Sequence, residues 1–238
     1  MKIDTNGNIY TFIYAAVMVI IVAAALAFTA IQLQPLQEQN VKVEKMQNIL
    51  QSVGVESTVE NAETQYNKYI TKQIVVNIEG EEISGEDAFT TNLKTQYKTK
   101  EKFPVYFAKL EDGTEKTIIP LTGKGLWAPV WGYIALESDF DTIFGAVFDH
   151  KAETPGLGAD INKDWFEKPF KGKTLFEGDE FVSVTLHKGG KGTAELLGDT
   201  EHGCDAISGG TITSKGVERM LKEEWLFNYE AFLKKNKN

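Results

Sequence analysis

The chain has 238 residues, of which 42% are hydrophobic and 25% charged, and its formal net charge is −9. These values are typical of a globular protein of one large or two small domains, and an acidic chain without a basic patch is not expected to bind nucleic acid. The single cysteine, Cys204, excludes an intrachain disulfide and a metal site built from several thiolates. His150, His187 and His202 form no HxxxH or HExxH pair, so we expect no metal site.

Residues 9–32 are predicted to form a single transmembrane helix after a short tail of residues 1–8. No charged residue stands between Asp4 and Glu38. At 1.5 Å per residue such a helix spans about 30 Å, the thickness of a bilayer core. A cleaved signal peptide is the alternative, but its apolar run is usually about 7 to 15 residues and follows a basic region. Here the apolar run is longer and Lys2 is offset by an acidic residue, which favours an uncleaved anchor.

Residues 33–100 are polar and acidic, and we expect a helical stalk that leads into the soluble domain. Pro35 is expected to end the membrane span or to start a new helix. Apolar residues then recur at three- and four-residue spacing as far as Val53, which predicts a helix, and Gly54 is expected to end it. A second helix is expected to run into a strand at Ile74–Val76.

Residues 101–238 are predicted to form an α+β domain, with a β-sheet flanked by helices. Short runs rich in β-branched and aromatic residues are separated by Gly, Asp and Lys turns, which is typical of strands. A final helix is expected after Ser214, because apolar residues recur there at spacings of four, four, four and three. The expected strands are residues 105–110, 116–123, 131–137, 142–149 and 181–189, and the helical stripe is Val217, Leu221, Trp225, Tyr229 and Phe232.

The segment "ETPGLGA", residues 153–159, is either a ligand-binding loop or an ordinary connection between strands. Pro155 and Gly156 form a strong turn signal. Gly158 adds a position at which a backbone can approach a ligand closely. The segment matches neither the GxGxxG fingerprint nor the P-loop, so it does not predict a nucleotide-phosphate site of those types.

Two tryptophans, Trp127 and Trp131, lie on either side of Pro129. Aromatic planes of this kind can stack on a flat cofactor. They can equally fill the core beneath an irregular strand, and we expect at least one of the two to do so.

The segment "DAISGGTITS", residues 205–214, combines four hydroxyl side chains with two glycines. Gly209 and Gly210 place no side chain ahead of Thr211, which leaves room for a group attached to that hydroxyl. The position before a helix also favours anions, because free amide groups point there. The alternative is a helix cap formed by Thr213 or Ser214, and the two interpretations are compatible.

The N-terminal span, "ETPGLGA" at 153–159 and "DAISGGT" at 205–211 ahead of a C-terminal helix together resemble a known family over essentially the whole chain. It is the NqrC/RnfG family of FMN-binding subunits of ion-translocating membrane redox complexes. The segments "GLWAPVWGYIAL" and "FDHKAETPGLGADI" are more similar to its NqrC branch, from Na+-translocating NADH:quinone reductase. The RnfG branch, from ferredoxin:NAD oxidoreductase, is the alternative.

In that family FMN is joined through its phosphate to the threonine that ends a D-x-x-S/T-G-A-T motif. Asp205, Ser208, Gly209 and Thr211 match this motif, and Gly210 stands where alanine is usual. The resemblance therefore implies Thr211 as the covalent attachment point of FMN. It also implies that the flavin site is lined by Glu153, Thr154, Gly156, Leu157 and Gly158. Trp127 is the aromatic side chain that we expect to stack on the cofactor there.

The resemblance further implies an electron relay on the route from NADH to quinone, without a complete active site on this chain. Its partners would be FMN- and iron–sulfur-bearing subunits of the same complex, and a flavin transferase for maturation. It implies a soluble domain on the outer, periplasmic face of the bacterial inner membrane, which the near balance of lysines around the span does not decide. A different class of protein, a flavin-free membrane-anchored binding module, is compatible with the anchor but assigns no role to Thr211.

Overall fold

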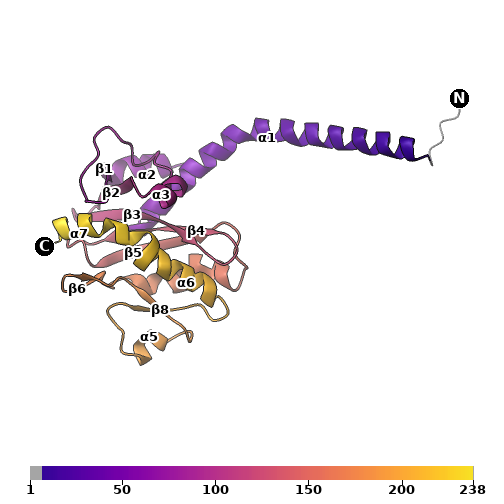
Figure 1. The fold of residues 1–238 in the computed structure, drawn as a ribbon. Coiled ribbons are helices and arrows are strands. Elements are labelled where there is room, and N and C mark those ends of the chain that lie inside the picture. Colours follow the sequence, from indigo (N-terminus) through magenta and orange to yellow (C-terminus); the bar gives the residue numbers. More distant parts are fainter. Residues whose placement is uncertain (1–6, 238) are drawn as a thin grey trace. The chain divides into compact units, whose positions relative to one another are not determined.

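The computed structural model describes residues 7–237. The chain separates into two units, one up to Lys45 and one from Met46 onward, and each is described by itself. Figure 1 follows the chain from the N-terminal helix through the sheet to the C-terminal helices.

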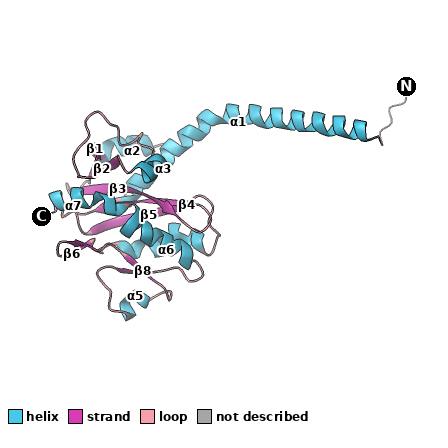
Figure 2. Cartoon of the chain, viewed as in Figure 1, coloured by secondary structure: helices cyan, strands magenta, loops and turns pink. Residues whose placement is uncertain are grey.

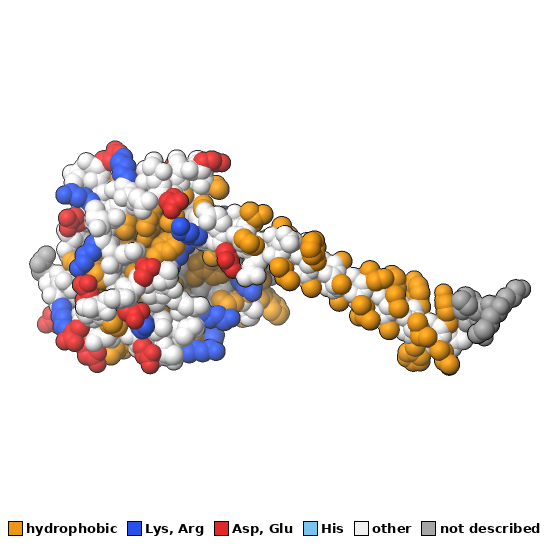
Figure 3. Space-filling model, turned by 90° about the horizontal axis from the view of Figure 1, so that it is seen from above, with side chains coloured by type: hydrophobic (Ala, Val, Ile, Leu, Met, Phe, Trp, Pro, Cys, Tyr) orange, Lys and Arg blue, Asp and Glu red, His pale blue; other side chains and the backbone are white. Residues whose placement is uncertain are grey.

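The first element is a long helix, α1 (Asn8–Ser52), whose N-terminal part is long and apolar enough to cross a membrane. Figure 3 shows hydrophobic side chains along this stretch, as suits a helix surrounded by lipid. The expectation that a new helix starts at Pro35 is wrong, because α1 continues through the proline. Good helix formers such as Leu36 and Gln37 follow the proline, and their propensity favours continuation of the helix. The helix ends just before Gly54, which has a φ of +74°, as expected of a stop signal.

The second unit is built on a five-stranded antiparallel sheet (Figure 2). Neighbouring strands pair in chain order, β1-β2-β3-β4-β5, so each connection joins adjacent strands. Four of the five expected strand segments fall in this sheet, together with the one expected at Ile74–Val76. The strands are β1 (Ile70–Val76), β2 (Phe103–Lys109), β3 (Glu115–Lys124), β4 (Pro129–Leu136) and β5 (Ile143–His150).

Residues 46–100, where the expected stalk leads into the soluble domain, contribute to this unit. Met46, Ile49 and Leu50, at the end of α1, are buried, and the carbonyl of Ser52 closely approaches Gly145 of β5. After α2 (Ala62–Tyr69) the chain enters β1 directly. The polar composition of this region did not predict its burial, because a short amphipathic helix and an edge strand bury only one side each.

Shorter elements connect the sheet to the C-terminal helices. The fifth expected strand, residues 181–189, forms only in fragments, because Ser183 adopts a φ of +51° that an extended strand does not allow. The two small ribbons are β6 (Phe176–Glu177) with β7 (Glu180–Phe181), and β8 (Thr185–His187) parallel to β9 (Gly203–Asp205). The short helices are α3 (Leu93–Thr99), η1 (Gly158–Asn162), α4 (Asp164–Glu167), η2 (Lys168–Phe170) and α5 (Thr193–Leu196).

The C-terminal segment buries the whole predicted apolar stripe, but it is not one regular helix. It passes through α6 (Thr211–Arg219), a π-helical turn η3 (Met220–Glu224), a 3-10 turn η4 (Leu226–Tyr229) and α7 (Glu230–Asn236). The indole N–H of Trp225 donates to the carbonyl of Pro120, and the hydroxyl of Tyr229 donates to that of Pro104, at 2.8 and 3.1 Å. These bonds to the sheet coincide with the change of helix type, where Trp225 leaves helical geometry with a φ of −133°.

Candidate functional site

A cavity of about 300 Å³ lies where the β3–β4 turn, the loop after β5 and the start of α6 meet. It brings together residues from three distant parts of the sequence, including eight of the expected site residues. Gly156, Ser208 and Asp205 lie outside its lining. The lining residues are Leu126, Trp127, Glu153, Thr154, Leu157, Gly158, Gly209, Gly210, Thr211, Ile212 and Thr213.

Thr211 is the first residue of α6 and is half-buried at the cavity. Gly210 precedes it as the N-cap residue, and no side chain caps the helix there. The first amides of a helix have no acceptor within the helix. Together with the helix dipole they make the space beside Thr211 suitable for an anion.

The expected start of this helix after Ser214 is wrong, and so is the capping role of Thr213 or Ser214. Both residues lie inside the first turn and are buried. The Ser214 hydroxyl donates to the carbonyl of Gly210 and accepts from the amide of Ile207, both at 3.0 Å. It thus holds the preceding loop against the helix rather than closing the helix end.

Thr213 contributes to the site in a way that the sequence patterns did not predict. Its hydroxyl donates a 2.7 Å hydrogen bond to Oε2 of Glu153. The other oxygen, Oε1, accepts from the amides of Trp127 and Ala128 at 2.9 and 3.2 Å. Glu153 therefore joins α6, its own loop and the β3–β4 turn. The spacing of Thr211 and Thr213 could not predict the hydrogen bond between Thr213 and Glu153, since these two residues are far apart in sequence.

Glu153 is only 6% exposed, yet it is held in its ionised form. Burial alone opposes ionisation, but hydrogen bonds from the Thr213 hydroxyl and from the amides of the β3–β4 turn outweigh it and lower the pKa of Glu153. A buried carboxylate that accepts this many hydrogen bonds is stabilised as the anion. Its oxygens are occupied by protein donors, which makes it a structural anchor of the cavity wall.

Glycines surround this carboxylate because there is no space for a side chain. A Cβ at Gly125 would collide with Oε1 of Glu153, and one at Gly158 would collide with the Thr213 hydroxyl. At Gly210 a Cβ would lie 2.9 Å from Cγ2 of Ile207. An alanine at position 210 would therefore fit only if Ile207 moved.

The rim of the cavity is apolar and exposed. The side chain of Trp127 is 72% exposed, and Leu126, Leu157 and Ile212 are exposed beside the same cavity. Trp131, by contrast, is half-buried in β4 but lies outside the buried core, so the expectation that at least one of the two tryptophans fills the core is wrong. Exposed apolar side chains around a cavity provide a surface for a flat ligand.

Two of the three expected residues outside the lining, Gly156 and Asp205, make other contacts. The amide of Gly156, whose φ is +74°, donates to Oδ1 of Asp160 at 3.0 Å within its turn. Ser208 is exposed. The carboxylate of Asp205 accepts from the amides of Gly192 and Ala194 at the start of α5.

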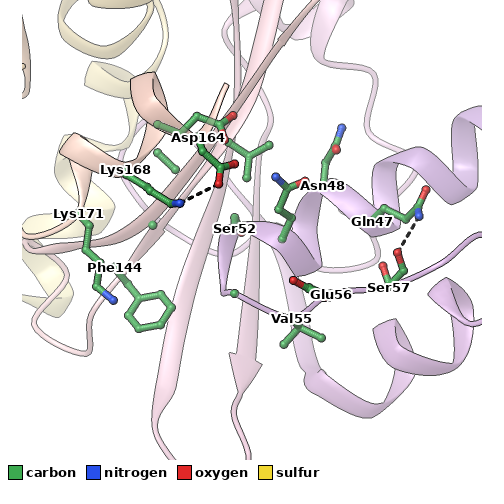
Figure 4. Close-up of a pocket in the computed structure, with 16 residues that line it drawn as sticks. Gln47, Asn48, Ser52, Val55, Glu56, Ser57, Phe144, Asp164, Lys168 and Lys171 are labelled. Atoms are coloured by element: carbon green, nitrogen blue, oxygen red, sulfur yellow. Dashed lines mark hydrogen bonds and ion pairs between the residues drawn. The ribbon is translucent and has the colours of Figure 1, made fainter. Parts of the chain in front are cut away.

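A larger cavity of about 900 Å³ lies elsewhere in the second unit, between the end of α1, β5 and α4 (Figure 4). None of the expected site residues lines it. Lys168 at its edge is paired with Asp164 at 2.8 Å, as the dashed line in Figure 4 shows. Glu167, also in the lining, is buried, and that burial is the main cause that raises its pKa to about 7. Its Oε1 accepts from the amide of Phe148 at 2.7 Å.

Within residues 7–237, no group of three or more His, Cys, Asp and Glu side chains is placed to hold a metal ion. Cys204 is buried, and burial raises the pKa of its thiol to about 12. A thiol in that state is a poor nucleophile.

Comparison with known proteins identifies the family of the domain that contains this cavity. Residues 125–224 match the model of the FMN-binding domain family, a range that contains Glu153 and Thr211. The chain is 32% identical over 236 residues to the NqrC subunit of the Na+-translocating NADH-quinone reductase of Neisseria meningitidis serogroup B, and the match covers 91% of this chain and 89% of the relative. It is 30% identical over 239 residues to the NqrC subunit of Haemophilus ducreyi, with coverage of 93% and 91%.

A solved structure supports the same relationship. The crystal structure of the NqrC subunit of Na+-translocating NADH-quinone reductase from Parabacteroides distasonis superposes with a TM-score of 0.76 at 46% sequence identity. The match covers 84% of this chain and 96% of that one. The chain therefore belongs to the family of NqrC subunits of the Na+-translocating NADH-quinone reductases, and it contains that family's FMN-binding domain.

Proposed function

We propose that this chain carries FMN as a phosphoester on Thr211 and relays electrons within a Na+-translocating NADH-quinone reductase. The observation that carries the proposal is the position of Thr211. This hydroxyl-bearing residue begins α6 without a side-chain cap and lines the cavity in the FMN-binding domain.

The residues around this cavity fit FMN. The uncapped amides of α6 suit the phosphate, since an anion can accept the hydrogen bonds that the helix leaves unused. Gly209 and Gly210 add no side chains beside the attachment point. The exposed rim of Leu126, Trp127 and Leu157 offers apolar area to the flavin ring. When bound, FMN supplies one- and two-electron redox chemistry, which no side chain of this chain provides.

Other hydroxyls near the cavity are less suitable. Those of Thr213 and Ser214 are buried and hydrogen-bonded to Glu153 and Gly210. Ser208 lies outside the lining. Thr154 lines the cavity, but it precedes Pro155 in a turn, and its own carbonyl already accepts from the amides of Leu157 and Ala159 where η1 begins. Among these hydroxyl-bearing residues, only Thr211 both lines the cavity without being buried and stands at the uncapped start of α6.

Attachment needs a separate enzyme and an activated flavin. A flavin dinucleotide provides both the FMN group and a leaving group. A bond forms between Oγ of Thr211 and the phosphorus of the FMN half, the bond from that phosphorus to AMP breaks, and the hydroxyl proton is released. Among the described residues around the cavity, Glu153 is the only carboxylate, and its oxygens already accept hydrogen bonds. A catalytic base from a flavin transferase is therefore part of the proposal.

The remaining parts of the proposal concern location and partners. The apolar part of α1 anchors the chain, and we place the second unit on the outer face of the inner membrane, as the family resemblance implies. Its electron partners are then the FMN- and iron–sulfur-bearing subunits. The quinone and sodium sites belong to those subunits, because α1 carries no charged residue between Asn8 and Gln37.

The test is covalent FMN on the intact chain. Co-expression with a flavin transferase is expected to raise the mass of the chain by that of one FMN joined as a phosphoester. The chain should then give a fluorescent band in a denaturing gel. Thr211→Ala should lose both signals, whereas Thr154→Ala, a matched threonine of the same cavity, should keep them. An unmodified, colourless wild-type chain would favour the flavin-free binding module instead. Covalent FMN on Thr211→Ala would contradict the proposed attachment site.

A further inference from the structure

Between β8 and β9 the chain forms a lobe, residues 188–202, that contains α5. Its tip presents two adjacent leucines to solvent, with Leu196 88% and Leu197 64% exposed. Neither residue lines the cavity beside Thr211, so a ligand in that cavity does not account for them. Large apolar side chains exposed as a pair are typical of a contact surface for another protein.

The base of the lobe is held in place by hydrogen bonds. Oδ1 of Asp205 accepts from the amide of Ala194 at 2.8 Å, and its other oxygen accepts from that of Gly192. These bonds provide acceptors for amides at the start of α5, where no local side chain caps the helix. On the other side of the lobe, Nε2 of His187 lies 2.7 Å from Oδ2 of Asp199. The lobe that carries the leucines is therefore tied to β8 and β9 by side-chain hydrogen bonds.

The lobe lies directly beside the loop that leads to Thr211. A Cβ at Gly190 would come within 3.8 Å of Cβ of Ser208, three residues before the threonine. Asp205, which holds the lobe, is the last residue of β9 and begins the same loop. The lobe and the attachment loop are thus one connected surface.

An enzyme that modifies Thr211 has to approach over this surface. Its catalytic site must come within bonding distance of the half-buried Thr211 hydroxyl. A stable protein interface covers roughly 800 Å² on each partner, about 20 to 30 residues. Ser208, three residues before Thr211, adjoins Gly190 of the lobe, so an enzyme that covers the attachment loop meets the lobe at this point.

We propose that the lobe of residues 188–202 is the docking element for the enzyme that transfers FMN onto Thr211. Leu196 and Leu197 supply the apolar contact, and Asp205 is a positioning residue that acts through the lobe rather than on the flavin. The partner is a flavin-dinucleotide-dependent transferase with an apolar recess beside its active site. The inference rests on the proposed phosphoester at Thr211.

The experiment uses the full chain in detergent, purified from a host without the transferase, together with purified transferase and flavin adenine dinucleotide. The initial rate of covalent flavin incorporation is measured at limiting chain concentration by in-gel fluorescence. The double variant Leu196→Ser/Leu197→Ser is expected to lower kcat/KM about tenfold, the effect of removing a central apolar contact, with the final extent of labelling unchanged. The matched control Val59→Ser/Ile78→Ser removes two exposed apolar side chains elsewhere and should react like the wild type.

Asp205→Asn tests the positioning role. This substitution should lower the initial rate of flavin incorporation. Combined with the leucine double variant it should lower that rate little further, because both changes act on the contact between the lobe and the transferase. A full additional loss in the triple variant would show that Asp205 acts on the transfer itself and would overturn that assignment. Melting temperatures of all variants are measured in parallel, and Leu196→Asp alone provides a second lobe variant if the double variant is destabilised.

The outcomes separate this inference from the proposed function. Flavin incorporation into Thr211→Ala refutes the attachment site itself. Incorporation at Thr211 with both lobe variants reacting at the wild-type rate overturns the docking role and leaves the attachment site intact. A lobe variant that is flavinylated normally but no longer co-purifies with the rest of the complex also overturns it, because the lobe then binds a neighbouring protein of that complex instead.

Discussion

The hydroxyl of Thr213 and the carboxylate of Glu153 meet through a 2.7 Å hydrogen bond that joins α6 to the loop after β5. The same carboxylate binds the amides of the β3–β4 turn. One buried side chain thus connects the three segments that enclose the cavity beside Thr211. Damage to this contact is expected to affect the whole site, because both oxygens of Glu153 accept hydrogen bonds from its walls.

Thr213→Val keeps the shape of the side chain and removes its hydrogen bond. A bond to a buried carboxylate contributes on the order of 1.5 to 3 kcal/mol, so we expect a loss of that size in the free energy of unfolding. Urea unfolding at pH 7 measures it. Thr154→Val, at an exposed position of the same cavity, serves as the control and should change stability little. Equal stability of the two variants would show that the bond contributes nothing.

The dependence of stability on pH should reveal the low pKa of Glu153. Its folded-state pKa lies below the ordinary value of 4.5, so its contribution is fully present above about 4.5 and is lost as the pH falls through the folded value. Glu153→Gln is therefore expected to cost most at neutral pH and progressively less below pH 4.5. Unfolding curves between pH 3 and 7 test this, and a constant difference across that range would exclude an ionised Glu153 as the cause.

The contribution of Glu167 to stability should depend on pH in the opposite way to that of Glu153. Burial raises its pKa to about 7, so the folded protein prefers the protonated acid, and a penalty accumulates as the pH rises from about 4.5 to 7. Glu167→Gln keeps an acceptor for the amide of Phe148 and removes the charge. It should raise stability by on the order of 2 kcal/mol at pH 8 and by little at pH 4. A stabilisation that is the same at both pH values would contradict the raised pKa.

Position 210 offers a test of local packing. Gly210→Ala restores the residue usual in the motif, yet its Cβ would lie 2.9 Å from Cγ2 of Ile207. We expect it to lower stability by about 1 to 3 kcal/mol in this chain, the usual cost of overpacking. Ile207→Ala removes that methyl group, so the double variant should lose less than the sum of the single ones. Strict additivity in urea unfolding would show that the two residues do not collide.

The side of the membrane on which the second unit lies can be measured with one cysteine. Native Cys204 is buried and its thiol pKa is raised to about 12, so the unmodified chain should not react with a maleimide. Val59→Cys places a thiol at an exposed position. If the unit faces outward, a membrane-impermeant maleimide added to cells with a permeabilised outer membrane should label it. Labelling only after the inner membrane is broken would place the unit inside.

Several elements followed from the sequence because local patterns determine them. The apolar stretch within α1, the strands β2 to β5 and the burial of the stripe from Val217 to Phe232 each depend on periodicity within a short window. The identification of the FMN-binding family likewise depended on two short motifs, around Glu153 and Thr211. The continuation of α1 through Pro35 was not predictable in this way, because a proline signals a break that its neighbours can outweigh.

By itself the sequence determined the apolar stretch that is long enough to span a membrane, the α+β class and the hydroxyl that we propose carries FMN, since each is written in contiguous residues. Only the tertiary structure decided which hydroxyl supports the site and which is accessible. Thr213 and Thr211 look equivalent in "GGTITS", but α6 begins at Thr211 and turns Thr213 inward to Glu153. Likewise, Asp205 adjoins the attachment loop in sequence but binds the lobe of α5 in space. The physical reason is that a hydrogen bond depends on direction and distance in the folded chain, and residues 60 positions apart acquire these only when the sheet and α6 pack together.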